Sequence, residues 1–199
     1  AGQALLHKSV RTIVEQVGAM KHMVNEFRDF GRLPSAVLAP LALNPWLRDM
    51  ASLYDNSAVP VVLNLDDEIP LVLADAQQLR QVLHNVIQNA QDACEIKFPG
   101  CILLQTKFNS VTKRVRLVVT DHGSGFAEHI LARAFEPYVT TKSHGTGLGL
   151  AVVKKIADDH GARLELSNKR VDGKVEGAQV LLSFATEVNV AHEVAQSGN

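Results

Sequence analysis

The sequence predicts a two-layer α/β sandwich with a mixed sheet, preceded by one long helix. Three observations support this fold class. Residues 6–27 carry a helical heptad pattern, two pairs of β-rich runs flank short polar turns, and helical patterns lie between these pairs. Locally paired strands with helices set between the pairs are typical of an α/β sandwich.

The composition is that of an ordinary globular protein, with 46% hydrophobic and 21% charged residues. The formal net charge is −1 and no polybasic run occurs, so we expect neither nucleic acid nor an anionic membrane as a partner. All apolar runs are far shorter than the roughly 20 residues of a membrane span. We expect Cys94 and Cys101 to be free thiols, and no histidine has the neighbours of a zinc site.

The first segment has apolar residues at alternating spacings of four and three, which predicts a helix with a heptad seam. The seam comprises Leu6, Val10, Ile13, Val17, Met20, Val24 and Phe27. One amphipathic helix cannot bury its stripe alone, so we expect a partner helix from a second copy or from a preceding segment. Packing on its own domain is the alternative. The helix should end near Gly31, with Pro34 beyond it.

The remaining elements follow from periodicity and turn residues. Residues 1–33 form the helical module, 34–44 a proline-rich linker, 45–186 the globular domain and 187–199 a flexible tail. Within the globular domain we expect a helix at 45–54, a strand at 59–65, a helix from its Asp75 cap to about 96, a hairpin of 102–108 with 115–120, helices at 127–134 and 148–160, and a hairpin of 163–167 with 178–184.

The predicted helix that begins after Asp75 carries the first chemical signal. Asn85 and Asn89 are four residues apart, so they are neighbours on one helix face. Two adjacent amide oxygens suit a hard cation such as Mg²⁺ that also holds phosphate oxygens. A pair of asparagines is more often part of a solvated polar face. The interpretation as a cation site therefore depends on the motifs that follow in the sequence.

The second signal is Asp121-His122-Gly123-Ser124-Gly125-Phe126, directly after the strand that ends at Thr120. An aspartate there can accept a hydrogen bond from the exocyclic amine of adenine, and glycines leave the main chain open to a flat ring. An ordinary β-turn is the alternative.

The third signal is the run Gly145-Thr146-Gly147-Leu148-Gly149-Leu150, which opens the helix at 148–160. A glycine-rich turn at a helix N-terminus presents N–H groups to phosphates. Lys142 stands three residues before it and can reach a phosphate as a point charge. The segment 140–146 could close over a nucleotide as a lid. The run matches neither a dinucleotide-binding fingerprint nor a Walker loop.

These stretches, with Phe135–Lys142 between the last two, resemble the N, G1, F and G2 boxes of the sensor histidine kinases. The wider superfamily includes the gyrase, heat-shock chaperone and mismatch-repair ATPases. The resemblance is greatest to the nitrogen-regulation type of kinase and covers about 45–186. The stretches read L-H-N-V-I-Q-N-A-Q-D-A, D-H-G-S-G-F, F-E-P-Y-V-T-T-K and G-T-G-L-G-L-A-V-V-K-K-I. Residues 23–34 resemble the end of the second dimerisation helix of that group.

The resemblance implies a Bergerat-type ATP-binding fold and a role for each motif. Asn85 and Asn89 would bind Mg²⁺ and phosphate, Asp121 would recognise adenine in a pocket shaped by Gly123 and Gly125, and Lys142 would bind phosphate. It extends contact with ATP to Asp92, Phe126, Gly145, Thr146, Gly147, Leu148, Gly149 and Leu150.

The implied activity is that of a protein histidine kinase, which moves the γ-phosphoryl group of ATP to a histidine for relay to a response-regulator receiver domain. Hydrolytic relatives carry a glutamate where Asn85 stands, so transfer is favoured over hydrolysis. The chain lacks the acceptor motif His-Glu-x-x-Asn-Pro, and Asp92 stands where many kinases have a basic residue.

The resemblance also implies a homodimer through residues 1–33 and a cytoplasmic domain, on a bacterial parent that can be anchored in the inner membrane. Three alternatives stay open: a hydrolysing ATPase of the superfamily, a nucleotide-binding regulatory module that never transfers phosphate, and a serine kinase.

Overall fold

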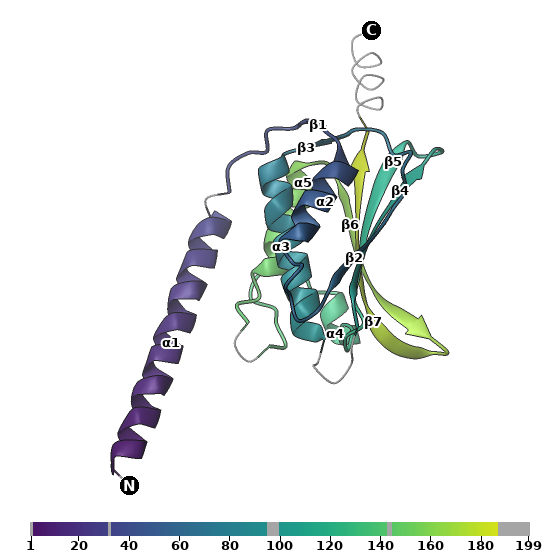
Figure 1. Cartoon of the computed structure of the whole chain (residues 1–199). Coiled ribbons are helices and arrows are strands. Elements are labelled where there is room, and N and C mark those ends of the chain that lie inside the picture. The colour runs from purple at the N-terminus through teal and green to yellow at the C-terminus, as the bar shows by residue number, and fades with distance from the viewer. Residues whose placement is uncertain (1, 32, 95–99, 143–144, 187–199) are drawn as a thin grey trace.

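The computed structural model describes residues 2–31, 33–94, 100–142 and 145–186. A long helix, α1 (Gly2–Gly31), stands apart from an α/β domain in which helices cover one face of a twisted sheet (Figure 1). The predicted fold class is therefore confirmed. The predicted tail, 187–199, lies outside the described residues.

The main sheet is mixed and has five strands in the order β2-β4-β5-β7-β6. Strand β2 pairs parallel with β4, and the other neighbours pair antiparallel. Both predicted hairpins are confirmed and are longer than expected. The strands are β2 (Val61–Leu65), β4 (Ile102–Asn109), β5 (Arg114–Thr120), β6 (Arg163–Val171) and β7 (Lys174–Ala185).

Three helices, α2 (Leu43–Ser52), α3 (Ala76–Ala93) and α5 (Gly149–Asp159), form the second layer (Figure 1). The short α4 (Glu128–Leu131) lies where a longer helix was expected. The predicted stripe of α3 is buried because it faces the sheet and α5. Burying each such aliphatic side chain contributes about 1.5–3 kcal/mol. Six of the seven residues expected in the stripe are at most 4% exposed, while the seventh, Ala93 in the last turn, is half-buried; the six are Leu79, Val82, Leu83, Val86, Ile87 and Ala90.

Asp75 caps α3 as predicted. Its Oδ1 accepts from the N–H groups of Gln77 (2.9 Å) and Gln78 (3.1 Å). Its Oδ2 accepts from the N–H of Val37 at 3.0 Å, which ties the segment before the domain to the helix start. That bond from Val37 is the largest of the causes that lower the pKa of the Asp75 carboxyl. The helix ends at Ala93, earlier than expected.

The segment predicted as a linker holds regular structure that the sequence did not reveal. Strand β1 (Ala39–Leu41) pairs antiparallel with β3 (Val72–Ala74), a strand that was also missed. Each is only three residues long, and β1 contains a proline, so the pairing depends on tertiary contacts rather than on local propensity.

Helix α2 begins at Leu43, two residues before the predicted start. We expected Asn44 to precede the helix, but it lies inside the first turn. Its side chain bonds elsewhere, because Nδ2 donates to the carbonyl of Asp66 and Oδ1 accepts from the Thr106 hydroxyl, both at 2.8 Å.

The predicted heptad seam runs along α1, and the helix ends at Gly31 as expected. Every seam residue from Leu6 to Phe27 is exposed, from 50% at Val10 to 64% at Met20 and Val24. This stripe is thus uncovered along its length. Within the described ranges, no helix combines the length and the apolar character that crossing a bilayer requires.

Candidate functional site

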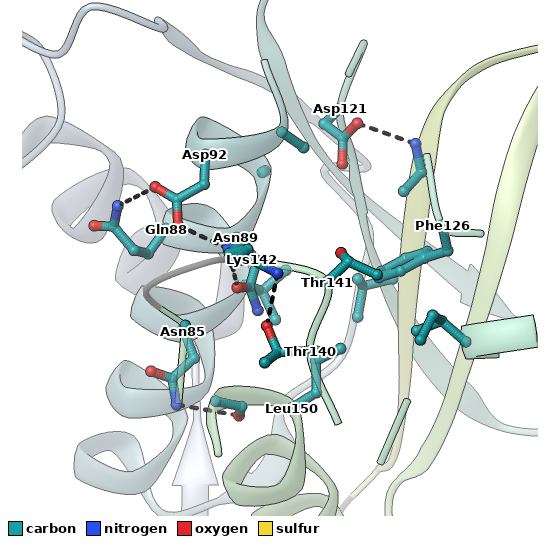
Figure 2. A pocket seen from close by; sticks show the side chains of 18 of the residues that line it. Asn85, Gln88, Asn89, Asp92, Asp121, Phe126, Thr140, Thr141, Lys142 and Leu150 are labelled. Carbon is teal, nitrogen blue, oxygen red and sulfur yellow. Dashed lines mark hydrogen bonds and ion pairs between the residues drawn. The ribbon is translucent and has the colours of Figure 1, made fainter. Parts of the chain in front are cut away.

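A cavity of about 370 Å³ lies where α3, the end of β5, residues 139–142 and 145–147, the start of α5 and β7 converge (Figure 2). The structure brings most of the predicted site residues together there. All of them except Gly123 and Leu148 line it: Asn85, Asn89, Asp92, Asp121, Gly125, Phe126, Lys142, Gly145, Thr146, Gly147, Gly149 and Leu150. Segments far apart in sequence therefore meet at one site.

Asp121 offers an oriented carboxylate to the cavity. Its Oδ1 accepts from the N–H of Gly123 at 2.8 Å and from the N–H of Ala178 at 3.0 Å. Among the described residues no donor pairs with Oδ2, so this oxygen is available to a ligand. The residue is only 7% exposed, and burial raises the pKa of its carboxyl, partly offset by the two N–H bonds.

The two glycines after Asp121 are needed for close packing. A Cβ on Gly123 would lie 2.5 Å from the carbonyl oxygen of Ala93, at the end of α3. Gly125 has φ +72°, and a Cβ there would lie 2.8 Å from Oδ1 of Asn168. We expected these glycines to admit a flat ligand, but at Gly123 the space is filled by protein.

Asn85 and Asn89 both face the cavity from consecutive turns of α3. The Nδ2 of Asn85 donates to the carbonyl of Gly149 at 3.4 Å, which links α3 to the glycine-rich turn (Figure 2). The Oδ1 of Asn89 accepts from the Lys142 ammonium at 2.9 Å.

Lys142 forms an ion pair that the sequence did not predict. Its Nζ lies 2.7 Å from Oδ2 of Asp92 as well as 2.9 Å from Asn89 (Figure 2). Gln88 donates to the other oxygen of Asp92 at 2.9 Å. Asn89 and Asp92 are three residues apart, so they lie on one face of the helix. This spacing could have indicated that both side chains bind the same cation.

The glycine-rich turn leaves the start of α5 open. Leu148 occupies the N-cap position without a side-chain cap, and it is fully buried. The first N–H groups of a helix have no partners within the helix, and among the described residues no side chain caps those of α5. The Thr146 hydroxyl accepts from the N–H of Leu148, one position before the helix, at 3.3 Å. Such an N-terminus favours an anion. Gly147 has φ +69°, and its carbonyl accepts from the N–H of Tyr138 at 3.1 Å.

Sequence reasoning missed several cavity residues. Gln88, Thr140 and Thr141 lie within the motif stretches, where no role was assigned to them, and line the cavity. Ala178 binds Asp121 through its main-chain N–H. The identity of its side chain therefore could not reveal this role in the sequence.

Residues 74–187 match the sequence model of the family described as "Histidine kinase-, DNA gyrase B-, and HSP90-like ATPase". The chain belongs to this family. The matched range contains every predicted site residue. The suspected relationship to the sensor histidine kinases is therefore confirmed.

Named relatives give the same result. The chain is 34% identical over 182 residues to "Nitrogen regulation protein NtrY" of Azorhizobium caulinodans, which covers 88% of this chain and 23% of that protein. It thus spans less than a quarter of that relative's length.

Two solved structures are similar in both fold and sequence. One is full-length ShkA in complex with AMPPNP, with TM-score 0.73 and 30% identity over 90% of this chain and 39% of that one. The other is the catalytic domain of histidine kinase ThkA, with TM-score 0.65 and 27% identity over 75% of this chain and 96% of that one. The chain contains a histidine kinase-type ATPase catalytic domain.

Proposed function

We propose that this domain binds ATP with Mg²⁺ and transfers the γ-phosphoryl group to a histidine outside this chain, for relay to the receiver domain of a response regulator. The observation that carries the proposal is the arrangement of the cavity. Asp121 holds an available carboxylate oxygen on one side, and Asn85 and the uncapped start of α5 lie on the other (Figure 2). This polarity matches a nucleotide, with its base at Asp121 and its phosphates at the helix N-terminus.

The residues on α3 fit a bound divalent cation. Oxygens of Asn89 and Asp92 already converge on one positive group, the Lys142 ammonium. Amide and carboxylate oxygens are the ligands that Mg²⁺ takes in proteins, usually together with phosphate oxygens and water. Asn85 and Asn89 would hold the ion, which neutralises phosphate charge when bound.

Transfer is favoured over hydrolysis by the residue at position 85. An asparagine cannot take a proton from water, and in the structure Asn85 is used to bind Gly149. The domain's own contribution would be to position the nucleotide and neutralise its charge.

The exposed seam of α1 supports a homodimer through residues 1–33. Seven apolar side chains, each at least half exposed, would be costly to leave in water, and a second copy presents a matching heptad stripe. The family resemblance supports a location of the domain in the bacterial cytoplasm, the compartment of its response regulator.

The test mixes the chain with Mg²⁺, γ-labelled ATP and a separately made acceptor-helix fragment. We expect label on a histidine of the fragment. Calorimetric titration with a non-hydrolysable ATP analogue should show binding by the chain alone. Binding with neither labelled histidine nor released phosphate would favour the regulatory module, and steady release of free phosphate would favour the hydrolysing ATPase.

Substitutions of Lys142 and of Asp92 should change the affinity for the ATP analogue in opposite directions. Replacing Lys142 with methionine should weaken binding of the ATP analogue about tenfold, because a cation near the phosphates is lost and Asp92 is left unbalanced. Asp92→Asn should tighten binding about two- to fivefold, because a like charge is removed and Lys142 is released. Calorimetric titration measures both, and weaker binding by Asp92→Asn would contradict this account.

A further inference from the structure

The hairpin of β6 and β7 extends beyond the other strands (Figure 1). Its residue Asn168 bonds Phe126, in the segment that follows Asp121. Its register shifts between Asn168 and Arg170, which marks a bulge or irregularity. Irregularities of this kind re-aim side chains and often lie beside active sites. The extra residue lies on β7, where Glu176 and Gly177 stand opposite Lys169, directly beside the pair of Asn168 with Ala178. No motif or comparison assigns Asn168 to the site.

Asn168 holds the main chain of Phe126 with both ends of its carboxamide. Its Oδ1 accepts from the N–H of Phe126 at 2.7 Å, and its Nδ2 donates to the carbonyl of Phe126 at 2.8 Å. This two-bond pairing copies a step of a β-ladder, and it fixes both the position and the rotation of the Phe126 peptide groups. Phe126 lines the cavity.

Directly opposite Asn168 in the hairpin is Ala178, which holds Asp121 in the same manner. The N–H of Ala178 donates to Oδ1 of Asp121, and its carbonyl accepts from the N–H of Asp121, both at 3.0 Å. One cross-strand pair therefore fixes the Asp121 carboxylate relative to the main chain of Phe126, from which the Phe126 ring projects. The close approach of Gly125 to Asn168 leaves little slack in this arrangement.

We infer that Asn168 is a positioning residue for recognition of the nucleotide base. This inference rests on the proposed function. A carboxylate oxygen must be aligned with the exocyclic amine of adenine while the ring lies against its apolar neighbours, and hydrogen bonds weaken steeply with misalignment. Asn168 acts through Phe126 on that alignment. Among the described residues, the side-chain hydrogen bonds of Asn168 go to Phe126 and not to Lys142 or the start of α5.

The test separates base recognition from general stability by comparing two nucleotides. ATP carries the exocyclic amine, and purine riboside triphosphate lacks it. Affinities for both, with Mg²⁺, are measured by calorimetric titration on the unmutated chain, on Asn168→Ala and on Arg170→Ala. Arg170 is the matched control, because it lies on the same hairpin but bonds the exposed Glu128 (2.8 Å) and does not line the cavity.

We expect the unmutated chain to prefer ATP by about tenfold or more. Asn168→Ala should weaken ATP binding about tenfold and reduce that preference at least about threefold, because two hydrogen bonds that fix Phe126 are lost. Arg170→Ala should change both affinities by less than about twofold.

Four results would overturn the inference. Unchanged ATP affinity in folded Asn168→Ala would do so, as would an equal loss for both nucleotides, which indicates a structural role alone. No binding by the unmutated chain would overturn the proposed function as well. If Asn168→Ala does not fold, Asn168→Asp, which keeps an acceptor for the Phe126 N–H, is measured in its place, and failure of both to fold would assign Asn168 to stability.

Discussion

Replacing Asp121 with asparagine is expected to lower the affinity for an ATP analogue about 30- to 100-fold while leaving the domain folded. The asparagine oxygen can still accept from the N–H groups of Gly123 and Ala178, so the local structure is kept. Its amide nitrogen then takes the place of Oδ2, and a donor faces the donor of the base. Loss of a hydrogen bond to a charged group costs about 1.5–3 kcal/mol, and the unmatched donors add to it.

The same substitution should not reduce stability. Burial raises the pKa of Asp121 in the folded state, so folding disfavours the ionised form. Stability therefore falls as pH rises from the unfolded-state pKa to the raised folded-state pKa, and stays lower above it. A neutral asparagine removes this penalty, so chemical denaturation near pH 7 should give an unchanged or slightly higher free energy of unfolding.

A pH titration supplies an independent check. The carboxylate must be ionised to accept from adenine, so affinity should fall on acidification, beginning above the range of an ordinary aspartate. The Asp121→Asn variant should lack this dependence. Asp92→Asn removes a carboxylate from the other side of the same cavity and should keep it. Full affinity in Asp121→Asn would place the base elsewhere.

The parts of the fold that the sequence predicted depend on local patterns. The buried stripe of α3 follows from helical periodicity, and that periodicity also puts Asn85 and Asn89 on one face. The hairpins follow from β-rich runs around polar turns. The cavity itself was predictable only through the resemblance, because its parts lie on separate segments spread along the chain from Asn85 to Val180.

The parts that were missed depend on tertiary partners. Strands β1 and β3 are too short to be recognised without each other. Lys142 was expected to bind a phosphate of the ligand. In the structure its charge is balanced by Asp92, 50 residues away. Asn168 belongs to no motif, and its role depends on a tertiary contact, because its side-chain amide bonds a main chain 42 residues distant, next to a register shift in the hairpin.

The largest loss of function is expected from Gly147→Ala. Its φ of +69° disfavours any residue with a Cβ, at a cost of about 1–2 kcal/mol. The added Cβ would also lie 2.5 Å from the carbonyl carbon and 2.7 Å from the Cα of Tyr138. These are main-chain atoms, so no side-chain rotation relieves the overlap, and the turn must move. Because this turn leads into the open start of α5, we expect affinity for the ATP analogue to fall by more than about 100-fold.

Gly161→Ala is the matched control for Gly147→Ala. Gly161 has a similar φ of +57°, at the end of α5 rather than at its start, and a Cβ there meets no atom of the described structure within 4 Å. It should therefore lose about 1–2 kcal/mol of stability through backbone strain alone and keep its nucleotide affinity. Chemical denaturation and calorimetric titration of both variants separate strain from displacement of the turn. Equal affinities in the two variants would mean that the N-terminus of α5 does not hold the phosphates.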